Sequence, residues 1–145
     1  MVRADRDEDY VIDVCDEILG EPALRQYRFG WLRGDPGRTG RRVALPVDAY
    51  WPDPAVVLEY RELQHEEPNR HFDKPDQLTI SGVHRGIQRA IYDARRDELI
   101  PANGIRLVVI TPHHLDATGR GRLRRTRSYD QPAIERLLLP DESGR

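Results

Sequence analysis

The sequence predicts a small α/β domain, and three observations support this prediction. The chain has 145 residues, a size typical of a single domain. Segments with helical spacing of apolar residues are interspersed with short runs rich in β-branched residues. The expected order of elements is helix, helix, strand, strand, helix, strand, helix. Such a mixture is typical of a small α/β fold.

Composition excludes several classes of protein. Charged residues make up 33% of the chain and the mean hydropathy is -0.72. No apolar run approaches the roughly 18–20 residues that a membrane span needs. The single cysteine, Cys15, excludes a disulfide framework and a multi-cysteine zinc site. The charged N-terminus has no apolar signal segment, so we expect a cytoplasmic protein without a membrane partner.

Charge is distributed unevenly along the chain. The net charge of -2 indicates that the chain as a whole is not a basic nucleic-acid binder. Acidic residues are concentrated in the first 17 residues, whereas the segment 120–127 carries arginines and no acid. Such a cluster can contact phosphates. Its members are Arg120, Arg122, Arg124, Arg125 and Arg127.

The first quarter of the chain is expected to be helical. Apolar residues with spacings of three and four predict an amphipathic helix over 8–19, with Gly20 as its C-terminal stop. A proline that suits a first helical turn follows. A second helix is expected from there, so that the helical N-terminus spans 8–33. Its apolar positions are Leu24, Tyr27 and Trp31.

Two strands joined by a short turn predict a β-hairpin. The segment 42–50 reads RVALPVDAY, the segment 55–63 reads AVVLEYREL, and a turn with two prolines separates them. Pro46 is unfavourable in a central strand because it has no N–H to donate. We therefore expect a bulge or a sheet edge at that position.

The second half of the chain is expected to complete the sheet. A polar loop over 66–77 precedes a helix that Ser81 can cap and that runs to about Leu99. Its inner face is expected to carry Val83, Ile87 and Ile91. The run IRLVVIT, 105–111, is typical of a strand buried on both faces. A short helix over 132–139 follows the arginine-rich segment.

Two carboxylates lie on the predicted hairpin. Asp48 ends the first strand and Glu59 lies in the second, so the two side chains can face the same side. Two carboxylates on adjacent strands make a hard oxygen site for Mg²⁺ or Mn²⁺. Gln64 and His65 follow at the end of the second strand. On spacing alone, a solvated hairpin with ordinary surface acids remains the more frequent arrangement.

The segment LPVDAYWPDPAVVLEYRELQH resembles the core of the PD-(D/E)XK restriction-endonuclease-like nucleases, in particular the branch related to very short patch repair endonucleases. The family has an Asp, a short turn and a strand reading roughly Glu-x-Asp-Gly-x-Gln-His, and residues 59–65 read EYRELQH. A polar loop and a helix reading roughly Arg-Asp-x-x-Lys-x-x-Tyr follow in the family, and residues 85–92 read RGIQRAIY. The resemblance covers about 42–111.

The resemblance implies a restriction-endonuclease-like fold, with a mixed sheet and a central β-hairpin flanked by helices. The single domain would span 1–145, with its core at about 42–111, the helical N-terminus at 8–33, and the arginine-rich segment and short helix at 118–139. The resemblance also implies that Asp48 and Glu59 bind the metal and that Gln64 and His65 complete the site. Arg89 stands where the family has a lysine on the helix, and Arg85 is a further candidate for nucleic-acid binding.

Arg61 departs from the family pattern, because it stands at the position of the lysine in the D/E-x-K motif. Arginine keeps its proton, with a pKa above about 12, so Arg61 cannot be a general base. It can hold the scissile phosphate instead. The base would then be metal-bound hydroxide assisted by His65. Strand alternation places Glu62 on the opposite face from Glu59. On the first helix, Glu17 is a candidate acid whose ordinary interpretation is an exposed residue.

These residues predict a metal-dependent endonuclease that hydrolyses DNA phosphodiester bonds. We expect a homodimer or a partner protein if both strands are cut. Two alternatives stay open: a DNA-binding module of the same fold that has lost catalysis, which Arg61 favours, and a ribonuclease that uses His65. The expected catalytic residues are Asp48, Glu59, Arg61, Gln64, His65 and Arg89.

Overall fold

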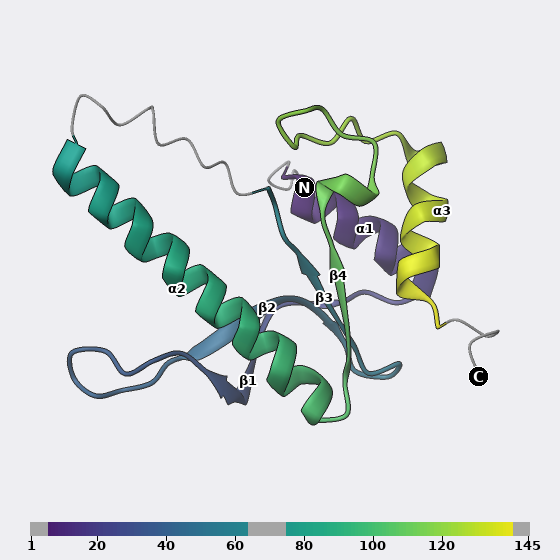
Figure 1. The fold of residues 1–145 in the computed structure, drawn as a ribbon. Helices are drawn as coiled ribbons and strands as arrows, with labels where there is room; N and C mark the ends of the chain where they lie inside the picture. The colour runs from purple at the N-terminus through teal and green to yellow at the C-terminus, as the bar shows by residue number, and fades with distance from the viewer. Residues whose placement is uncertain (1–5, 64–74, 141–145) are drawn as a thin grey trace, which may run out of the picture.

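The computed structural model describes residues 6–63 and 75–140, and it forms a four-stranded mixed sheet with helices on both faces (Figure 1). The predicted α/β class is confirmed. The elements are α1 (Asp7–Leu19), β1 (Leu24–Arg33), β2 (Ala44–Trp51), β3 (Val56–Tyr60), α2 (Pro75–Ala102), β4 (Arg106–Ile110), the short 3-10 helix η2 (Pro112–His114) and α3 (Arg127–Leu138).

The strands lie in the sheet in sequence order, from β1 to β4. The pairs β1–β2 and β2–β3 are antiparallel, whereas β4 runs parallel to β3. The predicted hairpin is therefore present as β2–β3, at the centre of a mixed sheet. A parallel pair cannot be joined by a tight turn, and α2 lies in the connection between β3 and β4.

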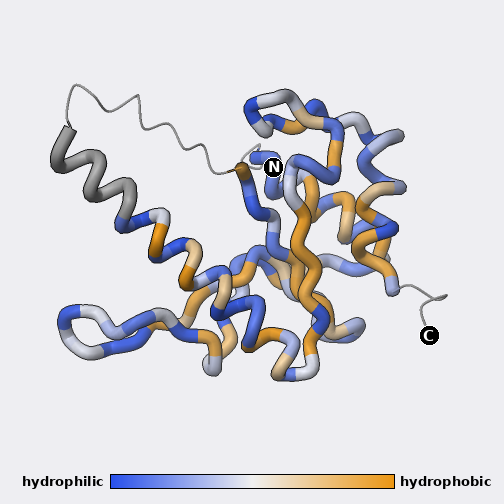
Figure 2. The backbone as a smooth tube through the Cα atoms, in the orientation of Figure 1, coloured by the Kyte–Doolittle hydropathy of each residue, from blue (hydrophilic) through white to orange (hydrophobic). Residues whose placement is uncertain are grey.

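Two apolar clusters pack against the two faces of the sheet. On one face, α1 and α3 cover side chains such as Trp51 and Leu58. On the other face, Ile100 of α2 packs over Val47 and Val57. Figure 2 shows the hydrophobic residues concentrated along the central strands and on the helix sides toward them. The layers are therefore α1 with α3, the sheet, and α2.

The first helix agrees with its prediction. Val11, Ile12, Val14 and Cys15 are fully buried, which is the result of apolar spacings of three and four. The helix ends at Gly20, whose φ of 79° is left-handed and whose N–H donates to the Asp16 carbonyl at 2.8 Å. Glycine adopts this conformation without a steric penalty from Cβ.

The second predicted helix is wrong, because residues 24–33 form strand β1. Tyr27, Phe29 and Trp31 occupy alternate positions, which is strand spacing, and aromatic residues favour strands. Their rings form a row, with centroids 4.9 Å apart for Tyr27–Phe29 and 4.5 Å apart for Phe29–Trp31. Pairing with β2 on one side and burial of this row under α2 outweigh the helical spacing.

The expectation of a bulge or an edge at Pro46 is wrong for the strand that carries it. β2 runs without interruption through Pro46 and lies inside the sheet. The irregularity falls on β1, where the register shifts between Arg28, which pairs with Pro46, and Arg33. Pro46 has no N–H to donate to the ladder. The pairing is irregular on the partner strand β1, which continues past Arg28 with a shifted register.

The long helix α2 differs from its prediction in two respects. It begins at Pro75, so Ser81 lies inside the helix and does not cap it, and residues 75–77 are not loop. Ile87 and Ile91, expected on the inner face, are 55% and 43% exposed. Only the C-terminal part of α2 lies over the sheet, and its N-terminal part projects beyond it (Figure 1). The side chain of Val83 and the rest of the predicted loop lie outside the described residues.

The remaining predicted elements are present with small shifts in their bounds. β4 spans Arg106–Ile110, and both of its faces are covered, because Leu107 packs on one cluster and Val108 belongs to the other. The last helix begins at Arg127, inside the arginine-rich segment. Within residues 6–63 and 75–140, we find no helix with the length and apolar character needed to cross a membrane.

Candidate functional site

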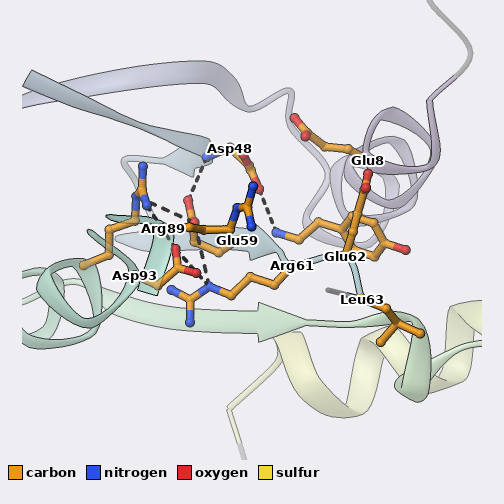
Figure 3. Close-up of a pocket in the computed structure, with 10 residues that line it drawn as sticks. Glu8, Asp48, Glu59, Arg61, Glu62, Leu63, Arg89 and Asp93 are labelled. Atoms are coloured by element: carbon orange, nitrogen blue, oxygen red, sulfur yellow. Dashed lines mark hydrogen bonds and ion pairs between the residues drawn. The ribbon is translucent and has the colours of Figure 1, made fainter. Parts of the chain in front are cut away.

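Asp48 and Glu59 lie opposite each other at the centre of the sheet. The register pairs Ala49 with Leu58, so the next opposing pair is Asp48 and Glu59, and opposing side chains share one face. Glu59 Oε2 accepts the backbone N–H of Asp48 at 3.1 Å (Figure 3). Asp48 Oδ2 accepts the backbone N–H of Tyr60 at 2.7 Å. The structure thus brings together the two carboxylates that the sequence suggested as a pair.

Glu59 is buried and Asp48 is half-buried, and the charges of the two carboxyl groups are not fully compensated. Glu59 is only 5% exposed. Burial raises its pKa to about 8, and the charge of Asp48 adds to the rise, although Arg96 and Arg61 oppose it. Burial also raises the pKa of Asp48, against the N–H of Tyr60, which favours the ionised form. Carboxyl groups in this state are stabilised as anions when a cation binds between them.

The pair opens onto a cavity of about 510 Å³ between the sheet, the start of α1 and the middle of α2 (Figure 3). The described lining is strongly charged, with five acids and three arginines. Glu8 comes from α1, Asp93 and Arg96 come from α2, and Arg61 and Glu62 come from the segment after β3. The cavity therefore suits a polar, charged ligand.

Glu8 is a site residue that the sequence analysis missed. It lies in the first turn of α1 and lines the cavity. Burial raises its pKa to about 7, with a further rise from the charge of Asp48. By contrast, Glu17, the acid considered on this helix, forms an ion pair with Arg127. The acidic first turn of α1 was a visible signal, but acids in that position also stabilise a helix without any functional role.

Gln26 is a second residue that the sequence did not reveal, because it was expected in a helix. The β1–β2 register places it opposite Asp48. Its side-chain amide donates to Glu8 Oε2 at 3.1 Å, and a further hydrogen bond with Asp48 lowers the pKa of that carboxyl. Its φ of 52° is left-handed, a conformation that costs a non-glycine residue about 1–3 kcal/mol.

On both β1 and β2, the side chains at alternate positions switch from one face of the sheet to the other near Gln26 and Asp48. On β1, Arg25 contacts acids of α1, whereas Tyr27 packs on the α2 side. On β2, Ala49 belongs to the cluster under α1 and Val47 to the cluster under α2. Residues two apart in a regular strand face the same way, so the strands twist sharply between these positions. The left-handed Gln26 lies at this switch.

Arg61 is held by α2. Its Nη2 donates to Asp97 Oδ1 at 2.9 Å. Its Nε lies 3.7 Å from Asp93 Oδ1 and 4.0 Å from Glu59 Oε1. This buried Nε has no hydrogen-bond acceptor. Arg61 is therefore fixed in place by its head group while one donor toward the acids stays unsatisfied.

Arg96 connects the same acids to β2. It donates to the Pro46 carbonyl from Nε at 3.2 Å and from Nη2 at 2.9 Å, and to Asp93 Oδ1 from Nη1 at 3.1 Å. Its Nε also lies 3.7 Å from Glu59 Oε1. This arginine consequently fixes the middle of α2 against the strand that carries Asp48.

The other expected catalytic residues are only partly described. Gln64 and His65 lie outside the described residues. Arg89 lines the cavity from α2 (Figure 3), and Arg85 is exposed about one turn earlier. Glu62 also lines the cavity, contrary to the expectation that it would face away. The alternation argument failed because β3 ends at Tyr60, so Glu62 lies beyond the regular strand.

The arginine-rich segment folds back onto acids of the protein. Arg124 pairs with Asp116 at 2.9 Å, and Arg125 pairs with Asp7 at 3.0 Å. Arg127 pairs with Glu17. Arg120 and Arg122 are exposed. Much of the positive charge expected to contact phosphates is therefore used in attaching this segment to its surroundings.

No protein-family model, curated protein or solved structure matches this chain. In the described parts of the chain, no three carboxylate, imidazole or thiol groups lie close enough together to hold a metal ion. The two crossed carboxylates still fit Mg²⁺, because that ion is often held by one or two carboxylates and keeps several waters.

Proposed function

We propose that the chain is a metal-dependent endonuclease that hydrolyses DNA phosphodiester bonds, with a restriction-endonuclease-like core. The observation that carries the proposal is a pair of carboxylates on the two central strands, the buried Glu59 and the half-buried Asp48. Each accepts a backbone N–H of the other strand, and both line a charged cavity. The sheet supports the fold assignment, since the resemblance implies a mixed sheet with these acids on its central hairpin.

Asp48 and Glu59 would hold Mg²⁺ or Mn²⁺. Their oxygens are the hard ligands that these ions prefer, and their raised pKa values reflect charge that a cation would compensate. Glu8, which lines the same cavity from α1, would interact with the ion through water. When bound, the metal supplies Lewis-acid activation of the phosphate and lowers the pKa of its water. The low exposure of Glu59, 5%, limits its contact with bulk water.

Arg61 would bind the scissile phosphate. A guanidinium stays protonated, so it acts as a donor and not as a base. Its Nε–H is buried without an acceptor, and a phosphate oxygen in the cavity would satisfy it. The hydrogen bond to Asp97 holds the head group in place, which reduces the ordering cost when substrate binds. Arg89 would contact the same strand from α2.

A second candidate function is DNA binding without cleavage. The observation that favours it is the engagement of Arg61 with Asp97 and its proximity to Asp93. These contacts compensate the charge of the guanidinium, and no lysine takes the position of the family's D/E-x-K lysine. In this case the cavity would bind the phosphate backbone, and the acids would serve only the fold.

The experiment is a cleavage assay on supercoiled plasmid and labelled oligonucleotides with Mg²⁺, Mn²⁺ or EDTA. Wild type is compared with Glu59→Gln, which keeps an acceptor for the Asp48 N–H, and with Glu98→Gln, an exposed acid of α2 outside the cavity. We expect metal-dependent cutting of DNA that Glu59→Gln lowers by at least about 100-fold and that Glu98→Gln leaves unchanged.

Each other outcome selects a different function. Cutting that persists in EDTA or in Glu59→Gln contradicts the proposal. Cutting of RNA alone identifies a ribonuclease. Binding of DNA without cleavage under any metal identifies the binding module.

A further inference from the structure

We propose that the long β1–β2 hairpin, residues 28–44 and called the arm below, is a binding surface for the phosphate backbone of duplex DNA. The inference rests on the proposed function, because it assigns a binding surface for the substrate of that site. It differs from the sequence-based expectation, which placed phosphate contacts in the arginine-rich segment near the C-terminus.

The first argument is uncompensated charge. The arm contains five arginines against one acid, Asp35, in a chain whose net charge is -2. That acid is engaged by Arg95 of α2 at 2.9 Å. All five arginines are exposed, and in the described parts of the chain none of them forms an ion pair with a carboxylate. They are Arg28, Arg33, Arg38, Arg41 and Arg42.

The second argument is that the arm is ordered before any ligand binds. Arg33 Nη1 donates to the Arg42 carbonyl at 2.8 Å, and Arg42 Nε donates to the Gly34 carbonyl at 2.8 Å. Backbone bonds continue toward the tip, where the Gly37 N–H donates to the Arg41 carbonyl at 2.9 Å. These contacts use only some of the five N–H donors of each guanidinium and do not neutralise its charge. The remaining donors can contact phosphates.

The third argument is the position of the arm relative to the cavity. The arm projects from the sheet beside α2 (Figure 1), and its tip is hydrophilic (Figure 2). α2 holds the middle of the arm, because the Asp35 N–H donates to the Tyr92 hydroxyl at 2.9 Å and Arg95 donates to the Arg33 carbonyl at 3.0 Å. Asp93, from the same helical turn, lines the cavity. A duplex that reaches the cavity can therefore also lie along the arm.

The chemistry of the arm suits duplex DNA. Duplex DNA carries one negative charge for each ~1.7 Å of its axis, and each arginine that neutralises a phosphate releases counterions. A two-stranded β-ribbon also fits the width of the B-DNA major groove, whereas the deep, narrow major groove of duplex RNA does not admit it. The arginines near the C-terminus differ, because Arg124, Arg125 and Arg127 pair with acids of the protein.

The test measures binding of a fluorescent DNA duplex to the full chain in EDTA, by anisotropy, from about 50 to about 200 mM salt. Arg38→Ala/Arg41→Ala removes two exposed guanidinium groups of the arm. Among the described residues, neither side chain makes a contact that would stabilise the fold. The matched control Arg136→Glu changes the net charge by the same two units at an exposed position of α3. We expect the arm variant to raise Kd at least about tenfold and to reduce the salt slope by about 2. The control variant should bind as wild type does.

Three results would overturn the inference: wild type that binds no duplex, an arm variant that binds like the control, or duplex RNA bound as tightly as DNA. Its failure is distinguishable from failure of the proposed nuclease. Cutting that depends on Glu59, together with unchanged binding by the arm variant, contradicts only the proposed role of the arm. Loss of binding in the arm variant, with no cutting by wild type, contradicts the proposed nuclease and supports the role of the arm. Melting temperatures of both variants verify that they fold.

Discussion

Glu59 on β3 accepts the backbone N–H of Asp48 on β2, and this side-chain contact follows the last regular pair of the β2–β3 ladder, Ala49 with Leu58. An acid that faces the cavity thus also satisfies a backbone donor of the neighbouring strand. The same residue consequently contributes to the fold and to the candidate site. Substitutions must be chosen so that these two contributions can be separated.

The first prediction separates them by comparing two substitutions of Glu59. Glu59→Ala leaves the Asp48 N–H without its acceptor and should lower the free energy of unfolding by about 1–3 kcal/mol. Glu59→Gln keeps an acceptor and is neutral at pH 7, as Glu59 largely is with its pKa raised to about 8, so its stability at neutral pH should equal or exceed that of wild type. Urea denaturation measures both. Equal losses in the two variants would show that the hydrogen bond to Asp48 does not stabilise the fold.

The second prediction concerns pH in the absence of metal. Burial and the charge of Asp48 raise the pKa of Glu59 to about 8 in the folded protein, from 4.5 as the ordinary value, while Arg61 and Arg96 oppose the rise. The folded state therefore retains a proton that the unfolded state loses. The stability from this group is present below about pH 4.5 and disappears as pH rises through about 8. The melting temperature in EDTA should fall across this window, and less steeply in Glu59→Gln.

The third prediction is that Mg²⁺ stabilises the fold. Binding to the native site alone raises the melting temperature, and the increase should be larger at about pH 8 than at about pH 5.5, since the ligands must lose their protons. Asp48→Asn should abolish the increase and Glu98→Gln should retain it. KCl at matched ionic strength controls for screening. An equal increase in Asp48→Asn would locate the bound ion elsewhere.

The fourth prediction uses the left-handed backbone of Gln26. Glycine tolerates a φ of 52° and alanine does not. Both substitutions remove the amide that contacts Glu8, so the difference in stability between the two variants measures the backbone strain at residue 26. Gln26→Gly should be more stable than Gln26→Ala by about 1 kcal/mol in chemical denaturation. The reverse order would mean that the strand relaxes out of this conformation.

The fifth prediction concerns Arg61 as a phosphate ligand. Arg61→Ala should lower cleavage by about 100-fold or more, as loss of an oriented donor does elsewhere. Asp97→Asn removes the charge that holds the guanidinium and should have a smaller effect, because Asp93 and Glu59 remain near Arg61. Single-turnover kinetics at saturating enzyme distinguish the chemical step from binding. Full activity in Arg61→Ala would exclude this role.

The hairpin and its two acids could be predicted because the information is local. A turn with two prolines lies between runs of β-branched residues, and this spacing alone places Asp48 opposite Glu59. The first helix was equally local, since the spacing of its buried residues and Gly20 define it. These elements can be predicted without knowing any contact between distant residues.

The rest depended on contacts between distant parts of the chain. Tyr27 and Trp31 fit a helical spacing together with Leu24 and a strand spacing together with Phe29, and only pairing with β2 decides between them. Glu8 lines the same cavity as Asp48 only because α1 packs against the sheet. The exposed Ile87 follows from the length of α2, which extends for 28 residues while only its C-terminal part meets the sheet.

A single turn of α2 carries contacts to two parts of the molecule. Tyr92 and Arg95 hold the arm, while Asp93 and Arg96 face the carboxylates. This turn therefore fixes the distance between the proposed DNA-binding arm and the proposed cleavage site. Inserting one residue between Asp93 and Arg95 would rotate Arg95 and Arg96 by about 100° relative to Tyr92 and Asp93. Each set of contacts would then lose one of its two residues, so the arm and the carboxylates would be disturbed together.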